Sequence, residues 1–155
     1  MIDFGTSTRI LGLDVGEKRT GVALSDENRF LSTPLTTIET RDRGVWVNKV
    51  IEIIDKEGVG EVVVGLPLNQ HGEEGKDAEW VRRYIALLKK RVSLPVVEWD
   101  ERFTTVQAEH SLIEADLSRK KRKEVIDQVA ASITLQCYLD CMRFKSEQMA
   151  HSEEE

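Results

Sequence analysis

The chain has 155 residues, of which 40% are hydrophobic and 32% charged, a balance typical of one compact globular domain and not of a disordered segment. No apolar run approaches the roughly 20 residues of a membrane-spanning helix, and the first ten residues do not have the pattern of a secretory signal. Two cysteines and three histidines lack the spacing of zinc ligands. We therefore expect a cytoplasmic domain with no membrane partner and no zinc site.

The net charge of -6 is at first unfavourable for a nucleic-acid partner. However, three of the acids lie in the tail at 151–155, while residues 119–123 (RKKRK) form a dense basic run. The distribution of charge therefore leaves nucleic acid open as a partner. We expect one domain across 1–155, with a core at about 9–145 and a disordered acidic tail at 146–155.

Hydrophobic spacing predicts alternating strands and helices along the chain. In order, these are strands at 9–15, 20–25 and 30–38, a helix at 42–57, a strand at 61–66, a helix at 77–90, a strand at 95–99, and helices at 104–115 and 121–145. The first two strands form a hairpin, and Pro34 puts the third at or near an edge of the sheet. This order predicts an α/β fold, a mixed five-stranded sheet with helices on both faces.

Carboxylates occur at three places where such a sheet could gather reactive groups. Asp14 lies inside an apolar strand, Asp100 and Glu101 end another strand, and Asp127 borders the buried stripe of the last helix. Each has an ordinary structural explanation as a turn residue, an ion-pair partner or a solvated border residue. Together they could hold two divalent ions for phosphodiester cleavage, and all-oxygen ligands would suit Mg2+ or Mn2+.

Positive charges near these acids predict contacts with a phosphate backbone. Cations at the start of a helix oppose its dipole, so stability does not explain the run at 119–123, whereas an approaching phosphate would. The alternative is a solvated exposed turn. The candidate nucleic-acid contacts are Lys18, Arg19, Asn69, Arg102, Lys121, Arg122 and Lys123.

Four segments resemble, in order, the motifs of the YqgF family, also called RuvX. They are Leu11–Asp26, Val64–Asn69 with the glycines that follow, Asp100–Thr105 and Lys120–Ala131. The resemblance spans about residues 9–140, nearly the whole chain. It implies an RNase H-like fold related to the RuvC junction resolvases. The implied activity is that of a nuclease acting on the 5′ end of pre-16S ribosomal RNA or, as the family was earlier described, on Holliday junctions.

The resemblance also implies roles for the acids, with Asp14 as the first catalytic residue and Asp127 as the last. Relatives in the wider fold carry a middle acid on the strand that here ends in Gly65-Leu66-Pro67. Asp100 or Glu101 on the neighbouring strand would have to replace it. The implied ligands of Mg2+ or Mn2+ are Asp14, Glu101 and Asp127.

We therefore predict a metal-dependent hydrolase of structured nucleic acid, with precursor rRNA favoured over a DNA junction and ribosomal particles as further partners. Two other classes remain. One is a phosphate-binding domain of the actin and sugar-kinase type, whose first hairpin also resembles Gly12–Gly16. The other is a non-catalytic RNA- or ribosome-associated module. The sequence leaves monomer and homodimer open.

Overall fold

The computed structural model describes residues 8–67, 75–100 and 119–154. Its elements are β1 (Arg9–Val15), β2 (Arg19–Ser25), β3 (Ser32–Glu39), α1 (Arg43–Glu57), β4 (Val59–Leu66), α2 (Lys76–Arg91), β5 (Val96–Asp100) and α4 (Arg119–Glu154). Each corresponds to an element predicted from the sequence. The helix predicted at 104–115 lies outside the described residues.

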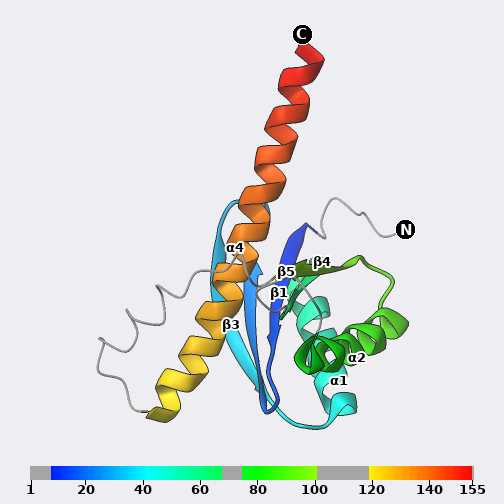
Figure 1. Cartoon of the computed structure of the whole chain (residues 1–155), viewed down its shortest axis with the longest axis vertical. Coiled ribbons are helices and arrows are strands. Elements are labelled where there is room, and N and C mark those ends of the chain that lie inside the picture. The colour runs from blue at the N-terminus through cyan, green and yellow to red at the C-terminus, as the bar shows by residue number, and fades with distance from the viewer. Residues whose placement is uncertain (1–7, 68–74, 101–118, 155) are drawn as a thin grey trace.

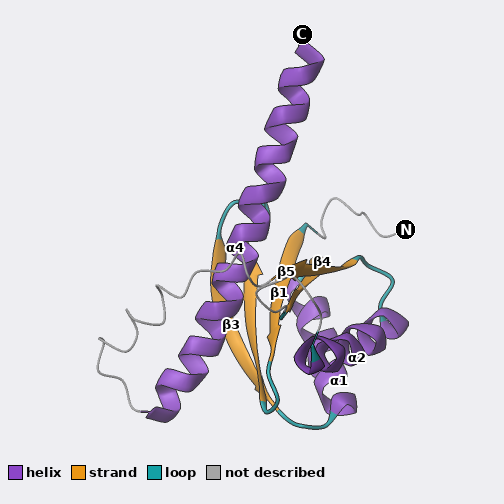
Figure 2. Ribbon diagram, in the orientation of Figure 1, coloured by secondary structure: helices purple, strands orange, loops and turns teal. Residues whose placement is uncertain are grey.

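The strands form one mixed sheet in the order β3-β2-β1-β4-β5. β1 pairs antiparallel with β2 and β2 antiparallel with β3, whereas β4 is parallel to both β1 and β5. Helices α1 and α2 cover one face of the sheet and α4 crosses the other (Figures 1 and 2). The predicted mixed five-stranded sheet with helices on both faces is confirmed, and Pro34 does lie on an edge strand.

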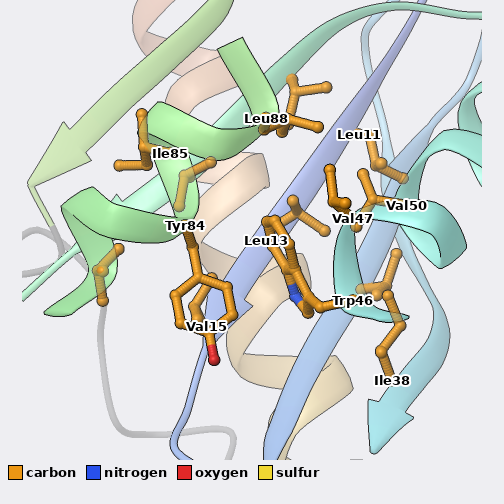
Figure 3. Packing of buried hydrophobic residues seen from close by; sticks show 14 of the residues in the cluster. Leu11, Leu13, Val15, Ile38, Trp46, Val47, Val50, Tyr84, Ile85 and Leu88 are labelled. Carbon is orange, nitrogen blue, oxygen red and sulfur yellow. The ribbon is translucent and has the colours of Figure 1, made fainter. Parts of the chain in front are cut away.

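The larger hydrophobic core lies between the sheet and the α1–α2 layer. Leu11, Leu13 and Val15 point from β1 into this core, because side chains alternate along a strand. Figure 3 shows Trp46 of α1 and Tyr84 of α2 packed beside these β1 residues. This layer fixes β1 at the centre of the sheet and forces its even-numbered side chains toward α4.

Glycines on the other face let α4 approach the sheet closely. A Cβ on Gly12 would stand 2.9 Å from Leu135 Cβ, and one on Gly21 would stand 1.8 Å from the carbonyl oxygen of Asp127. The second contact is with the helix backbone, which cannot rotate away. Any side chain at position 21 would therefore push the first half of α4 off the sheet.

Polar contacts hold α4 in register with the edge strand β3. Gln128 donates to the hydroxyl of Thr37 at 3.1 Å, and Gln136 accepts from the backbone N–H of Ser32 at 2.8 Å. Because Thr37 is late in β3 and Ser32 is its first residue, α4 runs antiparallel to β3. The N-terminal end of α4 is thus brought to the end of the sheet where β1 and β4 finish.

α4 is longer than predicted. It continues to Glu154 instead of ending near residue 145, so the tail at 146–155 that we expected to be disordered is helical through Glu154. The stretch contains no glycine or proline after position 119 that would stop a helix. The C-terminal part extends beyond the sheet (Figure 1), where Phe144 and Met149 are exposed. No helix in the described part of the chain is both long enough and apolar enough to span a membrane.

Replacing Gly21 with Ala should destabilise the fold strongly. We expect a loss of about 2 kcal/mol or more in the free energy of unfolding, because the added methyl group overlaps the Asp127 carbonyl. Urea denaturation measures this loss. Gly75→Ala is the matched control, since no atom of the described residues lies within 4 Å of its Cβ position, and it should change stability by less than about 0.5 kcal/mol. Equal effects of the two substitutions would contradict the proposed close approach.

Candidate active site

Asp14 is placed on the α4 face by the alternation of β1. Ile10 lies four residues earlier on the same face of β1 and packs in a second, smaller hydrophobic core between the sheet and α4. Gly12, between them, lies against Leu135 of that helix. Asp14 continues this row and is partly buried. Its Cα partner across the antiparallel pair is Gly21. The carboxylate therefore rises from the central strand beside the point where α4 is closest to the sheet.

Asp127 reaches the same place from α4. Its carbonyl oxygen lies directly over Gly21, and Gly21 is the register partner of Asp14. The structure thus brings together two acids that are more than a hundred positions apart in the sequence. The glycine is a residue that sequence reasoning missed, although glycine inside a strand is a recognised sign of close backbone approach.

Arg19 supplies positive charge beside Asp127. Its Nε donates to Asp127 Oδ2 at 2.9 Å, and the two side chains are 27% and 29% exposed. Arg19 opens β2, and the Gly16 N–H bonds to its carbonyl oxygen at 2.8 Å, which closes the β1–β2 turn. Both members of the pair are therefore held by backbone structure at the end of the sheet.

A small cavity of about 300 Å³ lies between this turn and α4. It is lined by Gly16, Glu17, Lys18, Arg19 and Asp127. Two predicted phosphate contacts, Lys18 and Arg19, thus lie at the same cavity as one of the predicted acids. In an open hollow, the cations could bind a phosphate backbone and the carboxylate could bind a metal ion.

Asp100 lies on the opposite face of the sheet. Val97 and Trp99 of β5 pack toward α4, whereas Asp100 is in register with Leu66, which belongs to the α1–α2 core. The preceding residue on that face, Glu98, accepts from Arg82 of α2 at 2.9 Å. The structure therefore does not bring Asp100 together with Asp14 and Asp127.

The other predicted site residues cannot be placed. Glu101, Arg102 and Asn69 lie outside the described residues, and so do the side chains at 121–123 on the first turns of α4. Within 8–67, 75–100 and 125–149, no three histidine, cysteine, aspartate or glutamate side chains are grouped as a metal site. Of the three predicted metal ligands, the described part of the chain contains Asp14 and Asp127, whose hard oxygens fit Mg2+ or Mn2+ better than zinc.

Comparison with known proteins assigns the family. The family model described as "RuvX: Holliday junction resolvase" matches residues 8–141. The chain belongs to this family. A RuvX relative from Moorella thermoacetica, named "Putative pre-16S rRNA nuclease", is 51% identical over 85% of this chain and 94% of its own. A relative of the same name from Thermoanaerobacter pseudethanolicus is 46% identical over 88% of this chain and 99% of its own.

Solved structures support the RNase H-like fold of this RuvX member. The Thermus thermophilus RuvC structure in complex with a Holliday junction substrate aligns with a TM-score of 0.53 at 15% identity, over 82% of this chain and 91% of that one. A second RuvC structure from the same organism gives a TM-score of 0.52 over 87% and 96% of the two chains. The predicted family and fold are thus confirmed.

The Arg19–Asp127 pair should contribute little to stability. Because both side chains are partly exposed, we expect a double-mutant cycle of Arg19→Gln and Asp127→Asn to give a coupling energy below about 1 kcal/mol that shrinks with added salt. Chemical denaturation of the four proteins measures it. A coupling of several kcal/mol would show that the pair is a structural element of the fold.

Proposed function

We propose that this chain is a metal-dependent nuclease that processes the 5′ end of precursor 16S rRNA. One observation carries the proposal: Asp127 of α4 packs against Gly21, and Gly21 is the residue paired with Asp14 across the β1–β2 ladder. This contact of the helix with the strand backbone places Asp127 beside the β1–β2 pair at the level of Asp14. The names of the curated relatives favour precursor rRNA as the substrate.

The metal ligands that we propose are Asp14, Asp127 and Glu101, holding Mg2+ or Mn2+. Such ions activate water and stabilise the leaving oxygen in phosphodiester hydrolysis. The task of the protein is to fix the carboxylates, and both described acids are attached to backbone that packing makes rigid. Arg19 compensates the charge of Asp127, which lowers the cost of keeping two carboxylates near each other at the end of the sheet.

We prefer Glu101 to Asp100 as the third acid, because Asp100 lies on the face of the sheet away from α4. Val97 and Trp99 are the β5 residues that pack on the α4 side. Asp100 belongs to the even-numbered set with Glu98, which pairs with α2. Glu101 is therefore the remaining candidate of the two.

The basic run directly precedes the site on the same helix, since Lys123 is one helical turn before Asp127. We propose that Lys121, Arg122 and Lys123 hold the phosphate backbone, together with Lys18 and Arg19 at the cavity. Arg102 and Asn69 are proposed as further contacts. We also expect a cytoplasmic location and ribosomal particles as the setting of the reaction.

Cleavage of a DNA junction is the second candidate, because the family model is described as a Holliday junction resolvase. Symmetric cleavage of a four-way junction needs two active sites, so this activity would favour a homodimer. Cleavage of a single precursor strand is compatible with a monomer. A non-catalytic RNA-binding module is the third hypothesis.

Asp14→Asn should abolish cleavage while the fold is retained. We expect the rate to fall by more than about 100-fold, because several kcal/mol of transition-state stabilisation depend on metal held by this carboxylate. Cleavage of a 5′-extended 16S precursor is measured with Mn2+ and with a chelator. Glu98→Gln is the matched control, since Glu98 is also a partly buried strand acid but lies on the other face, and it should remain active.

The same assay with a four-way DNA junction separates the candidates. Preferential cutting of the precursor supports the proposed function, and preferential cutting of the junction replaces it with resolvase activity. Metal-independent binding of RNA without cutting of either substrate would overturn it in favour of the binding module. Full activity of the Asp14→Asn protein would refute the site assignment.

A further inference from the structure

A second cavity, of about 450 Å³, lies on the other side of the β1–β2 turn. It is bounded by the end of β1, by Pro67 after β4 and by the first turns of α2. Gly16 and Glu17 line both this cavity and the smaller one beside Asp127. The two hollows are therefore neighbours that share a wall, and the proposed chemistry uses only the smaller one.

Trp80 forms the aromatic wall of the larger cavity. It is only partly buried, and its ring contacts Tyr84 with centroids 4.7 Å apart at an angle of 54°. Tyr84 in turn meets Trp46 edge-on at 4.8 Å. Trp46 is 1% exposed and donates its indole N–H to Thr20 at 2.9 Å. The row of rings thus runs from the core to the cavity and holds Trp80 in place before any ligand arrives.

The remaining lining is apolar inside and charged at the rim. Val15 and Val81 continue the apolar wall, while Lys76, Asp77 and Glu17 provide charges of both signs. Lys76 and Asp77 are exposed at the start of α2. A fixed aromatic ring with an adjacent cation is the combination that binds an unpaired base and its phosphate. The rim carboxylates suit the exocyclic amino groups of such a base.

We propose that this cavity binds an unpaired nucleobase of the substrate strand, next to the phosphate that is cleaved. Trp80 stacks on the base and Lys76 contacts a flanking phosphate. The identity of the ligand rests on the proposed nuclease function, because the shared wall at Gly16 and Glu17 lets a strand that occupies one cavity place a neighbouring nucleotide in the other. The cavity then contributes affinity and positions the strand, whereas the carboxylates perform the chemistry.

Abasic substitution of the RNA tests the proposal without relying on cleavage. Fluorescence anisotropy measures the Kd of the full-length Asp14→Asn protein for a precursor oligonucleotide whose single-stranded nucleotides are made abasic one at a time. With Trp80 present, we expect one or two positions at which loss of the base raises Kd roughly 5- to 100-fold, the range expected for one stacked base. Absence of any sensitive position would overturn the proposal.

Variants of Trp80 then assign that sensitivity to the cavity. In the same background, Trp80→Leu keeps an apolar side chain against Tyr84 but removes the stacking surface, so it should bind the intact RNA more weakly and lose its sensitivity to the abasic position. Trp80→Phe should retain much of both. Phe144→Leu is the control, since Phe144 is 61% exposed on the projecting part of α4, and it should behave like the parent. Unchanged abasic sensitivity in Trp80→Leu would refute the assignment.

A fluorescent base analogue provides a measurement that needs no substitution in the protein. Placed at the sensitive position, 2-aminopurine should be quenched on binding if it stacks on Trp80, and unchanged or increased fluorescence would contradict stacking. These experiments distinguish failure of the base-binding cavity from failure of the nuclease function. Cleavage without a sensitive base leaves the nuclease and removes the subsite, whereas a Trp80-dependent base without cleavage leaves the subsite and removes the nuclease.

Discussion

α4 packs directly against the backbone of β2 at Gly21, and this contact sets how close the helix comes to the sheet. The contact brings the carbonyl oxygen of Asp127 within 1.8 Å of the position that a Cβ would occupy. A helix usually rests on the side chains of a sheet, but here it rests on the sheet itself. That shorter distance puts the backbone of Asp127 beside Gly21, the register partner of Asp14.

The two faces of the sheet have different tasks. The α1–α2 face buries large side chains such as Leu13 and Trp46 and supplies most of the apolar core. The α4 face carries glycine at positions 12 and 21, so it buries less apolar side-chain area there but lets the helix backbone lie closer to the strands. The α4 side has a smaller apolar cluster, and Asp14 lies on that side near the end of β1.

The net charge of -6 does not describe the distribution of charge at the end of the sheet where β1 finishes. Arg19 and Lys18 line the cavity that Asp127 shares, and a basic run begins α4. Cations and a carboxylate therefore line the same hollow at this end of the sheet. This arrangement explains how an acidic chain can belong to a family of nucleic-acid enzymes.

The order of the elements, the mixed sheet, the edge position of Pro34 and the family could all be predicted from the sequence, because they follow from local periodicity and contiguous motifs. The sequence did not decide between Asp100 and Glu101, nor did it reveal the role of Gly21 or the cavity beside Trp80. Strand register put Asp100 on the α2 side, and packing of α4 on Gly21 joined two distant acids. Such juxtapositions depend on which face a side chain occupies and how closely two backbones approach, and both are fixed only by tertiary packing.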